Sequence, residues 1–457
     1  LDIDNAASHI IKNNLFGCEI DHFTAFLAST NLAIVSRCVD VPNIQIRDYL
    51  FSDMNQAFDL VVRNPPYIGH KNLSLSYKKA LKEKYHVYSD KADVSYCFFE
   101  KCYSDLKEKG ILCFITSRYF LEAEYAKHLR DFIVRHYSII GITDYSGLNL
   151  FKNVGISPLI ITLSKGIEQK DIRVVNLNAN KSYEISEDAF NSNHWNINDN
   201  QTRAIIDKFN AIADVLIEEV FNINQGIITG CDKAFIVDES TIIRNKLEKH
   251  VLVGWIKSSD LKGNDGIADQ KSLKLIYTNH RKMEEIPNTI KYLEQYKDTL
   301  EKRRECVSGI RRWFDLQWSR EKTLFENDKI LFPYKASRNQ FTLDTRKYYF
   351  SADVYMMTAK EEGKKLYNTL FFLNSDLFEF MIKSSAKKIG SNLFEYYPYL
   401  INKMPFIDIP EKIIESKQDY DKIMIQVNQY LYDYLEIDRT ERMIVNESIK
   451  WRKKEGK

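Results

Sequence analysis

A short segment, Asn64-Pro65-Pro66-Tyr67, carries the residue types best suited to chemistry, and it directly follows the apolar run Phe58–Val62. Each proline fixes its own φ angle and lacks an amide hydrogen, and the residue before a proline is held extended. The loop is therefore expected to be stiff and to present the Asn64 amide, free backbone carbonyl groups and the Tyr67 ring. The alternative is a proline-stiffened turn without a chemical role, because Asn-Pro commonly begins turns.

These groups suit the activation of an amino group that is attached to an aromatic base. Such an amino group is a poor nucleophile, because its lone pair is conjugated with the ring. Two acceptors that bind both N–H hydrogens draw the nitrogen toward tetrahedral geometry and free the lone pair. The Asn64 side-chain oxygen and the Pro65 carbonyl can be these acceptors, and the Tyr67 ring can stack on the base. No nucleophilic cysteine and no general-base histidine is required.

The surrounding sequence alternates short apolar runs with amphipathic helices. We expect strands at Leu15–Ile20, Ile44–Ile46, Phe58–Val62, Ile111–Thr116, Ile139–Thr143 and Leu159–Leu163. We expect helices over His22–Ser36, from an N-cap at Asp93 to Gly110, and over Glu124–Arg135. This alternation predicts a wound α/β sheet with helices on both faces, in which ligands bind at the carboxyl ends of the strands. The loop at Asn64 follows a strand and is expected at that edge.

Length and composition restrict the class of protein. The 457 residues predict several domains. Lysine and arginine exceed aspartate and glutamate by only two, which excludes a histone-like polycation and restricts any nucleic-acid surface to a local patch. The seven cysteines include no C-x-x-C pair, which favours a reducing compartment without a disulfide framework or a zinc site. No apolar run approaches the ~18 residues of a membrane span, and no secretion signal opens the chain.

The composition and the apolar pattern of the sequence change along the chain and predict four parts. Residues 1–180 form the α/β domain, and residues 181–215, rich in Asn, Ser and Asp, are expected to be a connector. Residues 216–408 combine short aromatic strands with many basic residues and few clear helices, which predicts an α+β domain. Residues 409–457 are expected to be a C-terminal helical segment, because apolar residues recur there at helical intervals.

The order of motifs resembles the γ-class N6-adenine DNA methyltransferases, of the TaqI type and of the single-chain, type IIG-like enzymes that join methylation to restriction. Asn64–Tyr67 matches the catalytic NPPY motif of that family. The other matching blocks occur in family order: Leu15–Asp21, Asp48, Lys109–Thr116 with Phe120-Leu121, and Leu150–Ser157. The resemblance implies a Rossmann-like class I methyltransferase domain.

The resemblance also implies roles for individual residues. Asn64, Pro65, Pro66 and Tyr67 would be catalytic, and Asn64 would also border the cofactor, S-adenosylmethionine. Glu19 would bind the ribose hydroxyls of that cofactor, and Ile20 would lie against its adenine ring. Asp48 would accept a hydrogen bond from the adenine amino group, with Phe51 packed near the ring. Phe151 would contact the flipped target base.

The later part of the chain resembles the TaqI-like recognition domain. The matching blocks are Gln225–Gly230 with Ala234–Ile236, Ile330–Pro333, and Phe350–Asp353 with Tyr355. The blocks Asn222–Phe235 and Arg303–Trp318 are most similar to the solitary adenine methyltransferases of clostridia.

Three features depart from the family pattern. The family has a glycine-rich cofactor loop upstream of the position of Leu15, and this chain has none. Because the chain begins at Leu1 rather than methionine, we expect that an upstream segment is missing. Arg63 precedes the motif where the family often has Gly or Ala, and Ser117 follows Thr116 where the family usually has proline.

Residues 301–340 contain ten basic and six acidic residues, a net charge of +4, with Trp313, Phe314 and Trp318 interleaved. Phosphates need point charges, base edges need arginine forks or amides, and aromatic side chains can wedge into the duplex. A second basic run covers residues 383–392. The alternative for either run is a solvated charged face. The candidate DNA-binding residues are Arg303, Arg304, Arg311, Arg312, Trp313, Trp318, Arg320, Lys335, Arg338, Lys387, Lys388 and Asn392.

The leading hypothesis is a site-specific DNA adenine N6-methyltransferase that uses S-adenosylmethionine, binds double-stranded DNA and needs no metal, membrane or obligate protein partner. Such an enzyme would be cytoplasmic. The alternatives are the methyltransferase half of a fused restriction enzyme, a protein glutamine N5-methyltransferase and a DNA-recognition subunit without catalysis. N4-cytosine methylation is disfavoured because that class typically has Ser or Asp at the position of Asn64.

Overall fold

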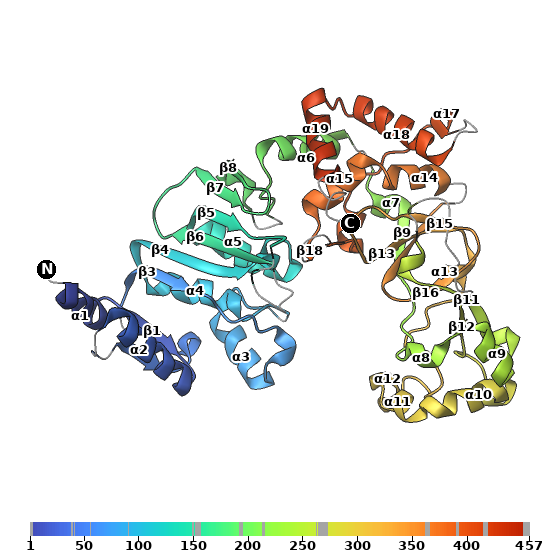
Figure 1. Ribbon diagram of the computed structural model, residues 1–457, viewed down its shortest axis with the longest axis horizontal. Helices are drawn as coiled ribbons and strands as arrows, with labels where there is room; N and C mark the ends of the chain where they lie inside the picture. Colours follow the sequence, from blue (N-terminus) through green and yellow to red (C-terminus); the bar gives the residue numbers. More distant parts are fainter. Residues whose placement is uncertain are drawn as a thin grey trace. The chain divides into compact units, whose positions relative to one another are not determined.

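The computed structural model describes residues 3–37, 40, 42–54, 56–89, 91–148, 150, 157–191, 195–212, 215–261, 263, 273–361, 366–389, 393–414 and 419–450. The chain divides into two compact units (Figure 1). The first consists of Leu1–Ser146 with Pro158–Ile197, and the second of Gly147–Ser157 with Asn198–Lys457.

The first unit is built on a six-stranded mixed sheet in the order β3-β4-β6-β5-β7-β8. Its strands are β3 (Phe58–Arg63), β4 (Leu106–Ser117), β5 (Ser138–Asp144), β6 (Pro158–Ser164), β7 (Asp171–Asn176) and β8 (Lys181–Ser186). β3 runs parallel to β4, and β6 lies antiparallel to both β4 and β5. The helices α4 (Ser95–Asp105) and α5 (Lys127–His136) pack on this sheet, while α3 (Leu75–Lys84) follows the Asn64 loop. The predicted mixed α/β architecture is confirmed.

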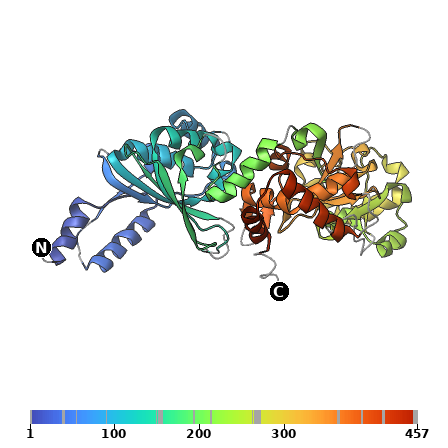
Figure 2. The ribbon, with the colours of Figure 1, turned by 90° about the horizontal axis from the view of Figure 1, so that it is seen from above.

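A separate parallel pair, β1 (Phe16–Glu19) and β2 (Asn43–Ile46), carries the helices α1 (Ile3–Asn13) and α2 (His22–Ser36). These helices extend away from the sheet in Figure 2. Among the described residues, no backbone ladder joins β1 to β3, although the Phe16 and Phe58 rings lie 5.7 Å apart. The predicted helix at 22–36 is confirmed, but its Phe23 and Phe26 side chains are 67% and 63% exposed. The helical spacing of apolar residues therefore predicts the helix correctly, but Phe23 and Phe26 do not lie on a buried face.

The prediction that Gly110 ends the helix that begins near Asp93 is wrong. The helix α4 ends at Asp105, and β4 begins at once with Leu106. Gly110 lies inside β4, where the β3–β4 register shifts between Phe58 and Leu60. An added Cβ at Gly110 would lie 2.8 Å from the Lys107 carbonyl oxygen, so this glycine permits a close backbone approach inside a strand.

The second unit contains three small sheets, in the orders β10-β12-β11-β16, β15-β13-β17-β9 and β14-β19-β18. Their strands are β9 (Phe221–Gln225), β10 (Ile236–Val237), β11 (Leu252–Ile256), β12 (Lys274–Ile276), β13 (Lys329–Pro333), β14 (Lys335–Ala336), β15 (Thr342–Asp344), β16 (Tyr349–Phe350), β17 (Val354–Ala359), β18 (Lys388–Ile389) and β19 (Leu393–Glu395). The blocks Ile330–Pro333 and Tyr355, which match the TaqI-like domain, lie in β13 and β17. Gly226 follows β9 where an added Cβ would meet the Ser351 carbonyl oxygen at 2.3 Å, so no other residue fits there without displacement.

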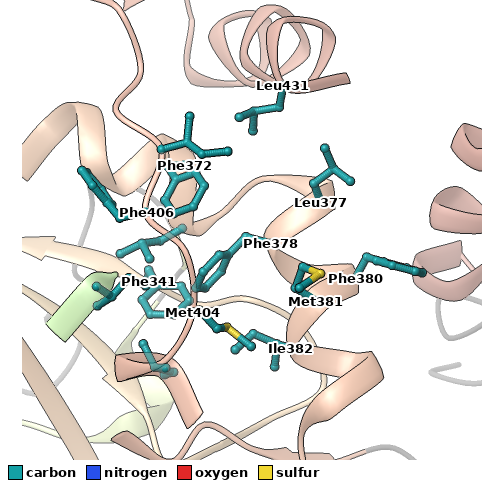
Figure 3. Packing of buried hydrophobic residues seen from close by; sticks show 14 of the residues in the cluster. Phe341, Phe372, Leu377, Phe378, Phe380, Met381, Ile382, Met404, Phe406 and Leu431 are labelled. Carbon is teal, nitrogen blue, oxygen red and sulfur yellow. The ribbon is translucent and has the colours of Figure 1, made fainter. Parts of the chain in front are cut away.

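This unit is more helical than predicted. Its helices are α6 (Asn200–Ile212), α7 (Ile217–Val220), α8 (Asp232–Phe235), α9 (Glu239–Asn245), α10 (Pro287–Leu293), α11 (Lys297–Glu301), α12 (Arg304–Val307), α13 (Thr323–Glu326), α14 (Leu366–Leu373), α15 (Asp376–Ser385), α16 (Pro398–Asn402), α17 (Glu411–Ile414), α18 (Tyr420–Tyr434) and α19 (Arg439–Lys450). Most residues of α14 and α15 are buried, and α14 has no charged residue, so it lacks the polar face that reveals an amphipathic period. Figure 3 shows Phe372 and Phe378 from these helices packed in one core with Phe406 and Leu431.

Two predicted boundaries differ from the structure. Residues 181–215, predicted to be a connector, contain the strand β8 of the first unit and the helix α6 of the second. The strand β8 lies at the edge of its sheet and is largely exposed, which accounts for its own polar residues, such as Lys181 and Glu184. Residues 409–457 include helices as predicted, but α18 contributes Ile423, Val427 and Leu431 to the core of the second unit. The C-terminal helices are therefore part of that unit.

A buried ion pair supports the sheet of β13. Lys329 Nζ lies 2.7 Å from Asp344 Oδ2, both side chains are fully buried, and the two residues are cross-strand partners. Burial lowers the pKa of Lys329, while Asp344 raises it. Removing one partner of such a pair leaves a buried charge uncompensated.

We therefore expect Asp344→Asn to lower the free energy of unfolding by about 3 kcal/mol, measured by urea unfolding. The double variant Lys329→Met, Asp344→Asn removes both charges and is expected to recover part of that loss. A double variant as unstable as Asp344→Asn alone would show that the pair is not the cause.

Candidate active site and DNA-binding surface

The Asn64 loop starts at the carboxyl end of β3. The parallel register pairs Arg63 with Phe114 of β4, and Asn64 follows at the edge of the sheet with an exposed side chain. The Tyr67 hydroxyl lies 3.0 Å from Asn64 Oδ1 and 3.2 Å from the carbonyl oxygen of Ile115, in β4, and its one hydrogen is shared between these two acceptors. The position predicted for this loop, after a strand and at its carboxyl end, is confirmed.

The Tyr67 hydroxyl stays protonated at neutral pH. Burial raises the pKa of Tyr67 to about 12, and the nearby Asp93 charge acts in the same direction. The hydroxyl therefore remains a donor, and it orients the Asn64 side chain. A carbonyl oxygen has two lone pairs, so Asn64 Oδ1 can accept a second hydrogen bond from a ligand.

Arg63, the residue that departs from the family pattern, stacks on two aromatic rings. Its guanidinium carbon lies 4.4 Å from the centroid of Tyr49 and 4.4 Å from the centroid of Phe98. Those two rings are themselves stacked, with an interplanar angle of 14°. Because Arg63 precedes Asn64 and Tyr49 follows Asp48, this stack links the segment that carries Asp48 to the loop that carries Asn64.

Asp48 is held by two hydrogen bonds. Its Oδ1 accepts from the Leu50 amide at 3.0 Å, which caps a short 3₁₀ helix at Tyr49–Phe51, and its Oδ2 accepts from the Tyr77 hydroxyl at 2.9 Å. The Phe51 ring is 40% exposed and lies edge-to-face on Tyr77, with centroids 5.4 Å apart. The sequence did not single out Tyr77. Tyr77 lies on α3, after the Asn64 loop, and belongs to none of the matched motifs, so the sequence offers no reason to select it.

Glu19 lies at the carboxyl end of β1. Its cross-strand partner is Ile46, so Glu19 and Asp48 lie at the same edge of the β1–β2 pair. Glu19 Oε1 accepts from the amides of Ile20 and Asp21 at 2.8 and 3.0 Å, and no described residue bonds to Oε2. The Ile20 side chain is 65% exposed. This arrangement offers an oriented carboxylate oxygen beside an apolar surface, which suits a ligand with hydroxyl groups and a ring.

Three of the candidate DNA-binding arginines form hydrogen bonds or ion pairs within the second unit. Arg303 is buried and donates to the carbonyl oxygens of Leu300, Thr229 and Trp313, and burial lowers its pKa. Arg320 donates to the Gly226 carbonyl and to Gln225 Oε1. Arg312 is exposed, but its guanidinium is paired with Asp315 at 2.7 Å. These hydrogen bonds hold backbone turns together.

Other candidates of this segment are accessible to a ligand. Arg304, Lys335 and Arg338 are exposed. The Arg311 guanidinium carbon lies 5.8 Å from the centroid of Trp318, whose side chain is 37% exposed.

The remaining candidates are less exposed or lie elsewhere. Trp313 is half-buried, with Lys297 Nζ 5.4 Å from its ring centroid. In the second basic run, Lys387 lies 3.6 Å from Glu395, and Lys388 is half-buried in β18. Phe151 and Asn392 lie outside the described residues.

Comparison with known proteins gives two domain matches. Residues 1–151 match the Eco57I restriction-modification methylase family, and residues 278–406 match the TaqI-like C-terminal specificity domain. The Type II methyltransferase M.HindII of Haemophilus influenzae is 25% identical over 444 residues, which cover 88% of this chain and 85% of that protein. The chain is thus similar to Type II methyltransferases over most of its length.

Further relatives agree with this assignment. The Type II methyltransferase M.BstVI of Geobacillus stearothermophilus is 22% identical, over 83% of this chain and 75% of that protein. Among solved structures, the Type IIL restriction-modification enzyme MmeI in complex with DNA matches with a TM-score of 0.67 at 13% identity, over 95% of this chain and 66% of that one. At this identity the likeness shows a common fold. The predicted methyltransferase-like α/β domain followed by a TaqI-like domain is thus confirmed.

None of the helices in the described part of the chain is long and apolar enough to cross a membrane. Within the same residues, no group of three or more His, Cys, Asp or Glu side chains is arranged to hold a metal ion.

The contact of Arg63 with the Tyr49 and Phe98 rings can be tested by substitution. We expect Arg63→Met to lower the free energy of unfolding of the first unit by about 1–2 kcal/mol, because a desolvated cation–π contact is lost, and Arg63→Lys to lower it less. Thermal unfolding measures both. The control is Arg135→Met, because Arg135 is 70% exposed in a surface ion pair with Asp131 and should change stability by less than ~0.5 kcal/mol. Equal effects of Arg63→Met and Arg135→Met would contradict the assigned contact.

Proposed function

We propose that this protein is a site-specific DNA methyltransferase that transfers a methyl group from S-adenosylmethionine to the N6 atom of adenine in duplex DNA. The observation that carries the proposal is the Asn64–Tyr67 loop at the carboxyl end of β3, with Asn64 exposed and oriented by Tyr67. The similarity to Type II methyltransferases supports the reaction class, and the TaqI-like domain supports DNA as the partner.

In the proposed reaction, Asn64 Oδ1 and the Pro65 carbonyl accept the two hydrogens of the target amino group. Both are fixed acceptors, because prolines 65 and 66 limit the backbone and Tyr67 limits the side chain. The amino nitrogen would then bond to the methyl carbon as that carbon's bond to the cofactor sulfur breaks, and the nitrogen would release one proton to water. The Tyr67 ring provides a stacking surface for the base, a contact worth about 1–3 kcal/mol.

The residues of the first unit fit the adenosine part of S-adenosylmethionine. Glu19 Oε2 can accept from the ribose hydroxyls, the Asp48 carboxylate can accept from the adenine amino group, and Ile20 and Phe51 expose apolar surface for the ring. The cofactor supplies an electrophilic methyl group when it is bound. None of the described residues is assigned to the methionine part of the cofactor.

A second candidate is the methyltransferase half of a fused restriction enzyme. The match of residues 1–151 to a restriction-modification methylase family favours it. So does the 28% identity over 118 residues to the Type II restriction enzyme and methyltransferase RM.Eco57I of Escherichia coli, of which this chain covers 12%. Assay of the purified protein for DNA cleavage as well as methylation separates the two.

The first test is the product and its dependence on Asn64. We expect mass analysis of nucleosides from DNA treated with the protein and S-adenosylmethionine to show N6-methyladenine. Asn64→Ala should abolish turnover while DNA binding persists, because the acceptor is lost but the TaqI-like domain is intact. Detection of N4-methylcytosine or of methylated protein would refute the proposal, and so would a near-normal rate for Asn64→Ala.

The second test concerns the proposed cofactor residues. We expect Glu19→Gln to weaken binding of S-adenosylmethionine roughly tenfold or more, as for the loss of a hydrogen bond to a charged group of about 1.5–3 kcal/mol, with DNA affinity unchanged. Isothermal titration measures both. The control is Glu83→Gln, an exposed residue at the end of α3. Equal loss of cofactor and DNA binding in Glu19→Gln would indicate misfolding rather than a cofactor role.

A further inference from the structure

A polar hollow of about 420 Å3 lies in the second unit, between a turn at residues 279–282 and the segment 309–312 with Asp315. The two segments are separated by 26 residues of sequence or more, and the 279–282 turn is not among the candidate DNA-binding residues. Among the described residues that line the hollow, only Asp315 is acidic.

Buried hydrogen bonds hold the two walls together. The Asn279 side chain donates to the Leu316 carbonyl at 3.3 Å and accepts from the Leu316 amide at 3.0 Å. The Thr278 hydroxyl donates to the Phe314 carbonyl at 2.5 Å. Because Thr278 and Asn279 are buried, these bonds set the spacing of the walls.

Arg312 completes this framework. Its Nε and Nη2 donate to the two Asp315 carboxylate oxygens at 2.9 and 2.7 Å, and its Nη1 donates to the Arg281 carbonyl at 2.8 Å. The guanidinium fork is therefore used within the protein. Arg312 neutralises the one acid of the hollow and fixes the backbone of Arg281.

The remaining charges of the hollow are positive. Arg281 and Arg311 are half-buried and Lys282 is exposed, and no described residue forms an ion pair with any of the three. A concave site with these cations and a neutralised acid attracts an anion. Arginine and lysine side chains commonly contact DNA phosphate oxygens, and arginine can bind a phosphate through two parallel hydrogen bonds.

We propose that this hollow receives a phosphodiester group of the DNA backbone, with Arg281, Lys282 and Arg311 as its cationic partners and Arg312 as a positioning residue. This inference rests on the proposed function, because that function supplies DNA as the partner. It reassigns Arg312 from contact with DNA to support of Arg281.

The test compares DNA binding of the full chain with that of Arg281→Gln, Lys282→Gln over a range of KCl concentrations, on two duplexes of unrelated sequence. We expect the slope of log K against log[KCl] to become shallower by about 2, since each lost phosphate contact lowers it by roughly 0.9. The loss of affinity should be the same on both duplexes. The matched control is Arg244→Gln, Lys249→Gln, which removes the same charges from exposed positions of the same unit outside the hollow, and it should leave the slope unchanged.

Two outcomes would overturn the inference. An unchanged slope would exclude phosphate contact, and a loss confined to one sequence would indicate base reading instead. If the double variant unfolds, Lys282→Glu at an exposed position replaces it and should still flatten the slope.

The pair variant Arg312→Ala, Asp315→Asn tests the positioning role without leaving an unpaired acid in the hollow. It should flatten the slope as Arg281→Gln alone does, and adding it to Arg281→Gln should cause no further change. Additive effects would show that Arg312 contacts DNA itself.

Methyl transfer, measured separately, distinguishes the two proposals. A protein that binds DNA through the hollow but yields no N6-methyladenine would refute the proposed function and keep the hollow. A protein that methylates adenine with an unaltered slope in the variant would refute the hollow alone. Absence of DNA binding would refute both.

Discussion

The parallel pairing of β3 with β4 is the constraint on which the candidate active site depends. It sets where β3 ends, and two prolines then prevent the chain from continuing as a strand or a helix. The Tyr67 hydroxyl bonds to the Ile115 carbonyl of β4 and to Asn64 of its own loop. One neighbouring strand therefore determines both the position of the Asn64 backbone and the direction of its side chain.

Arginines serve two purposes in this protein, and their chemistry explains the division. A guanidinium has five donors in a fixed fork, so a buried arginine can satisfy several carbonyl groups at once. Arg303 does this in the second unit, whereas the exposed Arg312 divides its fork between the Asp315 carboxylate and the Arg281 carbonyl. Arg63 instead uses the faces of two rings. A count of basic residues in a segment therefore overstates the charge available to DNA, because part of that charge holds the domain together.

The two units achieve their stability differently. The first depends mainly on one six-stranded sheet with its helices. The second has two apolar cores: one extends from β13, β14 and β19 to α18, and the other packs the β10-β12-β11-β16 sheet against β13 and β17. Because α14 lies within the core that extends to α18, it has no charged residue on any face. The same burial that stabilises α14 removes the periodicity by which a helix is normally identified.

Local sequence determined the α/β class, the helix at 22–36, the strand before Asn64 and the stiff loop after it, because these follow from short-range periodicity and from proline geometry. The tertiary structure alone decided the stack of Arg63 on Tyr49 and Phe98, the bond from Tyr77 to Asp48 and the joining of residues 279–282 to 309–315. Each of these contacts joins residues that are distant in sequence, and their spacing along the chain does not predict that the fold brings them together. Charge could be counted from the sequence, but its availability depends on which carbonyl or carboxylate lies beside each arginine after folding.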